Sequence, residues 1–399
     1  MASPQLTLGK RFILGVVALA IASAVWLPML SLLYRSDPTP YFRNNGPVAP
    51  KARMLAAYHL KLWTDPALRE REISKMRGAN AEWDFMGRTF LVLALANMAL
   101  REPAAQETYL KVADDIIDET LRLEREKGLH FFLMPYARRT PFVVQPPRSQ
   151  FLDGEIALML AARRAVAEKP AYKAPLTERV NLMVERMQKS PVLCAESYPD
   201  ECWTFCNALA LAAIRVADYL DGTDHSAFLR QWVATAKAKL IDLDTGILVS
   251  SFSLQGHHQD GPEGSSIWAV VHWLQLIDEG FASDQYRAAK EALAGGVLGF
   301  GYSREWPASW RGPEDIDSGP VVPVLGASAS ASGLAFLGAR SFGDTSYFAA
   351  LLASLDFAGF PTRRDGTLRY AASNQVGDAV VLYAAVLGPL WQKVKVVRR

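Results

Sequence analysis

Six strongly apolar segments, each opening with acidic or small polar residues, constrain the fold of this chain more than any other feature. The segments are EWDFMGRTFLVLALANMAL from Glu82, SQFLDGEIALMLAARRA from Ser149, DECWTFCNALALAAIRVA from Asp200, GPEGSSIWAVVHWLQLI from Gly261, DIDSGPVVPVLGASASASGLAFLGA from Asp315 and SNQVGDAVVLYAAVLGPLW from Ser373. Apolar residues occupy nearly every face of each segment, which is typical of a helix surrounded by protein. The polar opening residues can cap the free N–H groups at the start of such a helix.

More amphipathic, charged helices are predicted between the apolar ones, at 110–126, 177–188, 226–240 and 283–295. Successive openings are roughly 50 to 70 residues apart, about the length of a helical hairpin with its connections. The pattern predicts an all-α chain in which six hairpins close into an (α/α)6 barrel, or toroid. All six openings would then meet at one end and form a single concave site.

The N-terminal region is separate from this repeat. Residues 12–34 read FILGVVALAIASAVWLPMLSLLY, carry no charge and are long enough to cross a bilayer as one helix. Lys10 and Arg11 precede them, which favours a cytoplasmic N-terminus. We therefore expect a cytoplasmic segment at 1–11, a transmembrane anchor at 12–34, a linker at 35–50 and a barrel at 51–399. The expected arrangement is a single-pass inner-membrane protein with its body in the periplasm. A signal peptide cleaved near Ala22-Ser23-Ala24 is the alternative.

Charge and cysteine usage exclude several functional classes. The 43 Lys+Arg and 41 Asp+Glu residues almost balance, so a nucleic acid partner is not expected. Neither Cys202 with Cys206 nor the acidic and histidine group at 257–263 has the spacing of a zinc site, and no metal is predicted. Because the chain has three cysteines, at least one thiol stays free within it. A disulfide between Cys194 and Cys202 is one arrangement among several.

Acidic and aromatic side chains cluster at the six openings. Carboxylates crowded at one mouth and partly buried there should have raised pKa values suited to proton transfer. Glu155 and Asp317 are the strongest candidates because each is expected to begin an inner helix beside a glycine. The alternative is that such residues only stabilise helix N-termini. The aromatic residues at the same mouth could line an apolar pocket or stack on a sugar ring.

The segment around Cys206 resembles the linalool dehydratase-isomerase family. The likeness rests on the P-D-x-x-x-x-x-C-N core at 199–207, G-T-D at 222–224, L-I-D at 240–242, FLDGEIALM at 151–159, DSG at 317–319 and LRY at 368–370. The resemblance implies an (α/α)6 barrel, export, homo-oligomeric assembly and no cofactor. It also implies reversible loss or movement of a hydroxyl on a monoterpene alcohol, by acid/base residues in an apolar cavity.

The resemblance also assigns individual positions. Cys206 matches one active-site cysteine of the family, whereas Ser197 stands where the family has its second active-site cysteine. Glu155 stands at the position of the catalytic histidine, and Ser265 at that of a pocket tyrosine. Of these four positions, the chain therefore has the family's residue at one and a different residue at three.

We therefore hypothesise an enzyme that hydrates, dehydrates or isomerises a largely apolar, terpenoid-like alcohol. Glu155 would be the general acid/base, Cys206 and Ser197 would position the hydroxyl, and Asp84, Asp200 or Asp317 would be the complementary base. The residues expected to bind substrate are Phe151, Asp153, Tyr198, Asp200, Trp203, Ser265, Trp268 and Tyr370. The alternatives are a periplasmic glycan hydrolase or lyase, since paired carboxylates and aromatics also suit sugars, and a non-catalytic envelope binding protein.

Overall fold

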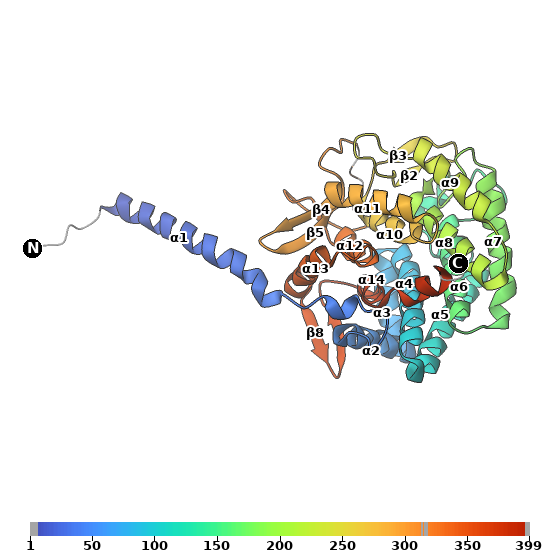
Figure 1. The fold of residues 1–399 in the computed structure, drawn as a ribbon, viewed down its shortest axis with the longest axis horizontal. Coiled ribbons are helices and arrows are strands. Elements are labelled where there is room, and N and C mark those ends of the chain that lie inside the picture. The colour runs from blue at the N-terminus through green and yellow to red at the C-terminus, as the bar shows by residue number, and fades with distance from the viewer. Residues whose placement is uncertain (1–6, 313, 315–317, 396–399) are drawn as a thin grey trace, which may run out of the picture.

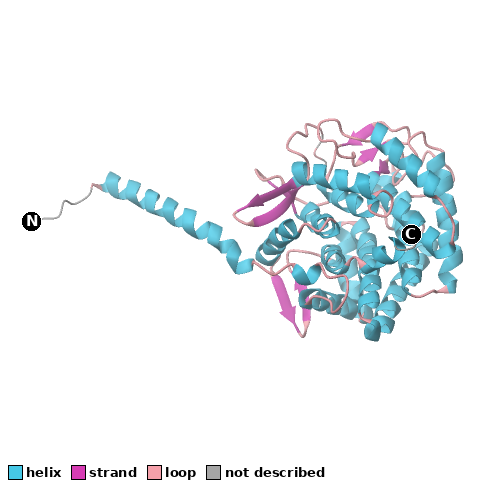
Figure 2. Ribbon diagram, in the orientation of Figure 1, coloured by secondary structure: helices cyan, strands magenta, loops and turns pink. Residues whose placement is uncertain are grey.

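The computed structural model describes residues 7–312, 314 and 318–395, and it is predominantly helical (Figure 2). The α-helices are α1 Leu8–Leu30, α2 Pro50–Thr64, α3 Pro66–Ala79, α4 Ala81–Arg101, α5 Gln106–Lys127, α6 Gln150–Val166, α7 Lys173–Gln188, α8 Thr204–Asp221, α9 Ser226–Lys239, α10 Gly264–Leu274, α11 Glu279–Leu293, α12 Ala329–Ser341, α13 Thr345–Ala358, α14 Gln375–Val386 and α15 Pro389–Lys395. Short 3-10 helices are η1 Ser31–Tyr34, η2 Thr39–Tyr41, η3 Pro103–Ala105, η4 Leu129–Phe131, η5 Pro135–Arg138 and η6 Pro170–Tyr172.

The strands are short and form three small antiparallel sheets at the edges of the helical body. Their order is β1-β2-β3, β4-β5-β7-β6 and β8-β9. Their bounds are β1 Cys202–Trp203, β2 Ser251–Phe252, β3 His258–Asp260, β4 Ala294–Val297, β5 Phe300–Arg304, β6 Val321–Val322, β7 Ala327–Ser328, β8 Pro361–Arg364 and β9 Thr367–Tyr370. The β4–β5 hairpin is not predicted by the helical pattern of the sequence.

Six helices form a closed inner ring. Each of α4, α6, α8, α10, α12 and α14 packs against the next in that order, and α14 packs back against α4. Their burial on all sides follows from their sequences: every residue from 90 to 99 of α4, for example, is at most 1% exposed. Such a helix can exist only where neighbours cover every face.

The helices between the ring members lie outside it (Figure 1). α5 packs on α4 and α6, α7 on α6 and α8, α11 on α10, α13 on α12, and α2 on α14. Of these outer helices, α5 and α11 are clearly amphipathic, as their sequences predict, and each buries one stripe against the ring. The alternation of buried and half-exposed helices is confirmed.

Side-chain caps define where several inner helices begin. Asn80 Oδ1 accepts the Glu82 N–H at 2.8 Å, Ser328 Oγ accepts the Ala331 N–H at 3.2 Å, and Asn374 Oδ1 accepts the Gly377 N–H at 3.0 Å. Each satisfies a helix N–H that has no partner within the helix. The polar openings thus set helix starts, independently of any chemistry.

The fifth inner helix corrects one expectation. It begins at Ala329 and not near Asp315, because the preceding stretch contains Pro320 and Pro323 and forms β6 and β7 instead. Asp317 therefore does not begin an inner helix, and it lies outside the described residues.

The N-terminal helix α1 projects from the body (Figure 1). The segment Leu8–Tyr34 is 27 residues long, and its most apolar 18-residue stretch has a mean hydropathy of 2.3. None of that stretch is buried against protein. By length and composition this segment can span a membrane. Its C-terminal end joins the body through η1.

Candidate functional site

A cavity of about 160 Å³ opens at one end of the ring, and the first turns of all six inner helices line it. The lining residues are Asn80, Glu82, Trp83, Met86, Tyr136, Phe151, Tyr198, Trp203, Phe205, Cys206, Glu263, Ser265, Ser266, Ser318, Ala329, Ser330, Gly333, Leu334, Val376, Gly377 and Val380. The expectation that six separate openings meet in one concave site is confirmed.

The walls of this cavity are largely apolar. Trp83 and Met86 come from α4, Phe151 from α6, Phe205 from α8 and Val380 from α14. Polar groups interrupt these walls at a few points, chiefly two carboxylates, one thiol and several hydroxyls. Apolar walls with few convergent polar groups are typical of a small-molecule site.

Glu155 lies one helical turn deeper in α6 than the lining residue Phe151 and is 1% exposed. Its Oε2 accepts a 2.6 Å hydrogen bond from the Thr89 hydroxyl, whereas Oε1 has no partner among the described residues. Burial raises the pKa of Glu155 to about 8, the bond from Thr89 opposes that rise, and the nearby Glu82 adds to it. The carboxyl group is therefore largely protonated at neutral pH.

Close packing of α6 on α8 brings Glu155 near Cys206. A Cβ added at Gly154 would meet Ala210 Cβ at 3.3 Å and the Cys206 carbonyl oxygen at 3.4 Å, so the two helices are close enough here that a larger residue would have to displace its neighbours. Cys206 lines the cavity and is 6% exposed. Burial raises the pKa of the Cys206 thiol well above the ordinary value, and the charges of Glu155 and Glu82 raise it further. A hydrogen bond with Ser197 acts in the opposite direction and lowers this pKa. The thiol is therefore neutral, and suited to hydrogen bonding more than to nucleophilic attack.

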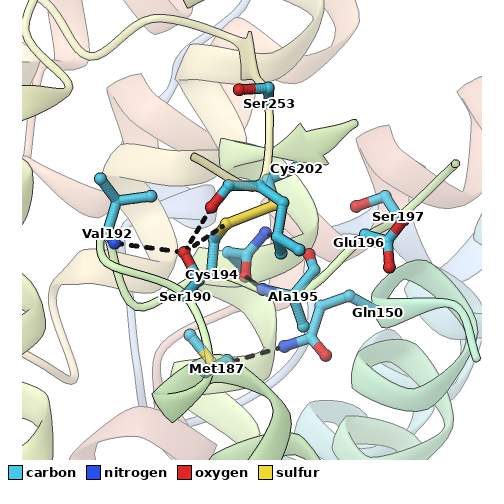
Figure 3. The surroundings of a disulfide bond; sticks show 12 residues. Gln150, Met187, Ser190, Val192, Cys194, Ala195, Glu196, Ser197, Cys202 and Ser253 are labelled. Atoms are coloured by element: carbon cyan, nitrogen blue, oxygen red, sulfur yellow. Dashed lines mark hydrogen bonds between the residues drawn. A yellow bond between two sulfur atoms is a disulfide. The ribbon is translucent and has the colours of Figure 1, made fainter. Parts of the chain in front are cut away.

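A disulfide joins Cys194 to Cys202 and leaves Cys206 as the free, buried cysteine (Figure 3). The loop that it closes is tied to the start of α6. The Ser149 hydroxyl donates to the Ser197 carbonyl oxygen at 2.7 Å, and the Gln150 N–H donates to the Glu196 carbonyl oxygen at 2.8 Å. Ser197 is thus held, fully buried, between the first turns of α6 and α8.

Tyr198 and Glu82 form a second polar group at the cavity wall. The Tyr198 hydroxyl donates to Glu82 Oε1 and accepts the Met134 N–H at 2.9 Å. Its ring stacks on Tyr136, with 4.6 Å between ring centroids. Burial raises the pKa of Tyr198, and the charge of Glu82 adds to the rise. Glu82 is thereby oriented by a neutral phenol.

Ser265 lines the opposite side of the ring, at the start of α10. Its hydroxyl donates to Glu305 Oε1, which also accepts the Ser265 N–H at 3.1 Å. The other oxygen, Glu305 Oε2, has no partner among the described residues, and Glu305 is 1% exposed. The serine is thus oriented by a buried carboxylate.

Three predicted carboxylates lie away from the cavity. Asp84 is paired with Arg88 at 2.8 Å and with Arg77 at 3.2 Å. Asp153 is paired with Arg148 and Arg179 on the outer side of α6. Asp200 is exposed and accepts the Leu254 N–H at 3.1 Å. The structure gives these three groups ion-pairing or loop-forming contacts.

Two predicted aromatic residues also lie in the core and not in the cavity wall. The Trp268 indole donates to Ser303 Oγ at 2.6 Å, and its ring packs on Tyr286 and Tyr347. Tyr370 lies on β9, where its N–H donates to Asp378 Oδ2 at 3.3 Å. Of the predicted substrate-binding residues, the structure brings Phe151, Tyr198, Trp203 and Ser265 into the lining.

Several lining residues were not among the predicted site residues. Glu82 and Glu263 each precede or begin an inner helix, but nothing in the sequence separates them from the acidic residues nearby. Tyr136 comes from η5, an extra turn between α5 and α6. Across the described part of the chain, no group of three or more His, Cys, Asp or Glu side chains is placed to hold a metal ion.

Glycoside hydrolases are among the solved structures similar to this chain. A possible member of glycoside hydrolase family 105 from Salmonella enterica is 14% identical, with a TM-score of 0.50, covering 75% of this chain and 82% of that chain. A family 76 glycoside hydrolase from a bovine Bacteroides thetaiotaomicron strain is 11% identical, with a TM-score of 0.49 and coverages of 77% and 69%. A family 76 α-mannanase from Bacteroides thetaiotaomicron is 10% identical, with a TM-score of 0.48 and coverages of 77% and 86%. At these identities the likeness concerns the fold alone.

A family comparison gives a more specific result. The model of the linalool dehydratase/isomerase family matches residues 155–376, which run from the buried carboxyl of α6 to the first turn of α14. The matched range includes Cys206, Glu263 and Ser265.

Proposed function

This chain belongs to the linalool dehydratase/isomerase family, and we propose that it dehydrates, hydrates or isomerises a largely apolar, terpenoid-like alcohol inside an (α/α)6 barrel. One observation carries the proposal: a buried carboxyl group with a pKa near 8 lies directly behind the only free thiol of an apolar-walled cavity. A protonated carboxyl group can act as the general acid that protonates a hydroxyl, which then leaves as water.

The size and walls of the cavity support a small apolar substrate. An apolar cavity of about 150 Å³ holds a benzene-sized molecule, and the cavity here is about 160 Å³ and open at one end. It would enclose the part of a terpenoid alcohol that carries the hydroxyl, with the rest of the hydrocarbon toward the opening. Trp83, Met86 and Phe151 would contact the hydrocarbon part. The few polar groups would orient a single hydroxyl.

The proposed chemistry is a proton transfer to the substrate oxygen and a proton transfer from the carbon next to the C–O bond. Glu155 supplies a proton, passed through the Cys206 thiol, to the substrate hydroxyl while Ser197 orders that thiol. The C–O bond breaks with its electron pair on oxygen, and water leaves. A carboxylate then removes a proton from the adjacent carbon to form the alkene, and the reverse sequence adds water. Glu82 takes this role in place of Asp84, because it lines the cavity and is oriented by Tyr198.

A glycan hydrolase or lyase is the second candidate, favoured by one specific observation. Glu82 and Glu263 line the same cavity together with Trp83 and Trp203, so two carboxylates and two indoles face one space. Against it, the cavity is small and mostly apolar, whereas a sugar would need polar partners for each hydroxyl.

The decisive experiment uses the purified full chain with a panel of terpenoid alcohols and the corresponding alkenes in D2O. Addition of water across a double bond in D2O places deuterium on carbon, and repeated loss and re-addition of water exchanges carbon-bound hydrogen for deuterium. Mass spectrometry detects both, and it detects net dehydration as formation of the alkene. We expect deuterium incorporation that Glu155→Gln abolishes. Glu107→Gln, which changes an exposed glutamate of α5, is the matched control and should retain activity. Full turnover by Glu155→Gln would refute the assignment, and release of reducing sugar from glycans would favour the second candidate.

We further propose that α1 anchors the protein in the inner membrane, with the body in the periplasm. The Cys194–Cys202 disulfide supports an oxidising compartment for the body. A reporter enzyme that is active only after export, fused after Lys395, should be active. Activity of a cytoplasm-specific reporter at the same position would contradict this topology.

A further inference from the structure

Exposed apolar side chains are concentrated on one side of the body. Among the described residues after α1, ten large apolar side chains are exposed: Leu32, Leu33, Val143, Leu243, Val297, Leu298, Val322, Val324, Phe357 and Phe360. Eight of these ten belong to η1, to the β4-β5-β7-β6 sheet with its turns, or to the end of α13. The other two, Val143 and Leu243, are isolated and lie in other loops. Single exposed apolar residues are ordinary, but a gathering of this kind marks an interaction surface.

The β4–β5 hairpin and α13 adjoin the end of α1. Tyr34 of η1 packs on Phe357 of α13 and on Phe300 of β5, with ring centroids 5.3 Å and 6.2 Å apart, and these two phenylalanines are 5.0 Å apart. A Cβ at Gly299, in the β4–β5 turn, would overlap Ser31 Oγ. β4, β5, α13 and β8 lie on the side of the body from which α1 leaves (Figures 1 and 2). The hairpin tip and α13 are therefore fixed to the last turn of the N-terminal segment.

The length of α1 determines where η1, and the elements packed on it, lie relative to the bilayer. Residues 12–30 are uncharged and helical, and 19 residues at 1.5 Å each span about 28 Å, close to the roughly 30 Å of a bilayer hydrocarbon core. With this stretch in the core, η1 lies at the level of the lipid headgroups. Elements packed on η1 are then within reach of the membrane surface.

Backbone conformation and charge agree with a lipid-facing role. Leu298, Val324 and Phe360 have φ angles of 52°, 69° and 51°, which are unfavourable for large or β-branched residues. All three are at turns and are exposed, so their side chains are held outward at an energetic cost. Arg363 and Arg364 are exposed on β8, the strand that follows Phe360, and Arg364 Nε lies 3.4 Å from Asp365 Oδ2. Arg363 therefore supplies the positive charge beside this apolar set. Arginines near apolar tips are typical of surfaces that bind anionic lipid headgroups.

We propose that the tip of the β4–β5 hairpin, the β6–β7 turn and the end of α13 form a membrane-proximal face. This face rests on the same bilayer that α1 spans. Its apolar side chains enter the headgroup region, and Arg363 contacts lipid phosphates. The inference depends on the proposal that α1 spans a membrane, and it adds that the body is held against the lipid in one orientation instead of turning freely on a tether.

The test places an environment-sensitive fluorophore at single introduced cysteines in the full chain. The protein is reconstituted in nanodiscs of phosphatidylethanolamine and phosphatidylglycerol, with spin-labelled lipids as quenchers at headgroup or mid-chain depth. The sites are Leu298→Cys and Phe360→Cys on the face, Leu243→Cys as an exposed control, and Val17→Cys inside α1. The unsubstituted chain, whose free cysteine is buried, gives the labelling background.

We expect labels at 298 and 360 to shift to shorter emission wavelength and to be quenched several times more by headgroup spin labels than the label at 243. If the label at 17 is quenched by mid-chain spin labels while 298 and 360 behave like 243, α1 spans the bilayer and the membrane-proximal face is refuted. If the label at 17 is not quenched, the anchor itself fails. A wavelength shift at 298 and 360 without lipid quenching would mean that protein covers the face, which also overturns the proposal.

Discussion

The raised pKa of Glu155 makes a quantitative prediction for Glu155→Gln. In the folded chain this carboxyl group has a pKa of about 8, against an ordinary value of 4.5 that applies in the unfolded chain. Below pH 4.5 both states hold the proton, and ionisation does not affect the free energy of unfolding. As pH rises, the unfolded state loses its proton first, so the wild type loses stability until pH passes about 8 and then levels off.

The magnitude follows from the two pKa values. Each pH unit between them changes the free energy of unfolding by about 1.4 kcal/mol, which amounts to roughly 3.5 kcal/mol between pH 5 and pH 8. For a chain of 399 residues, an unfolding entropy of about 2.1 cal/mol/K per residue makes 1 kcal/mol worth about 1.2 °C. Glutamine cannot ionise, so the Tm of Glu155→Gln minus that of wild type should rise by roughly 4 °C over this range.

Thermal unfolding of the full chain in detergent, followed by tryptophan fluorescence at pH steps from 5 to 9, measures this difference. Glu107→Gln is the control, and its Tm should follow that of wild type across the range because the side chain is exposed. The test uses the change of the difference with pH, so a constant loss from an imperfect amide fit at position 155 does not affect it. A difference that stays flat from pH 5 to pH 8 would refute the raised pKa, and with it the acid role of Glu155.

Three further predictions concern the groups around the site. Thr89→Val removes the hydrogen bond that lowers the pKa of Glu155, so the pH above which activity falls should move upward; an unchanged or lower value in pH–rate profiles would contradict it. Cys202→Ser removes the disulfide that joins residues eight apart and should lower the free energy of unfolding by roughly 2–3 kcal/mol. Urea unfolding measures this loss. In reducing agent the wild type also lacks the disulfide, so the difference between the two proteins should disappear. Asp84→Asn breaks a buried ion pair with Arg88 and should lower the free energy of unfolding by roughly 3 kcal/mol, while kcat stays unchanged. A loss of kcat without loss of stability would contradict this and support a catalytic role for Asp84.

The ring and its shared cavity could be predicted because they follow from hydrophobic patterning. A helix that is apolar on every face must be surrounded, and six such helices with amphipathic partners between them have few arrangements. The fifth helix start was misplaced because the acidic residues at 314–317 resemble an opening. Pro320 and Pro323 were the stronger local signal, since neither suits a helix interior.

The choice among neighbouring carboxylates could not be predicted. Asp153 and Glu155 are two residues apart, about 200° around the helix, so at most one can face the ring interior. The structure turns Asp153 outward to Arg148 and Arg179, and Glu155 inward to Thr89. The same geometry separates Glu82, which lines the cavity, from Asp84. Helix rotation depends on packing across the whole ring, and a local motif does not contain that information.

The way in which the cavity is built also bears on how such a protein can change. Each inner helix supplies its lining from its first two turns, while the apolar residues further along the helix hold the ring together. Substitutions at Trp83, Phe151 or Val380 would reshape one wall without disturbing the other five. New substrates could therefore be acquired one wall at a time, on a scaffold whose stability comes from residues that the substrate never contacts.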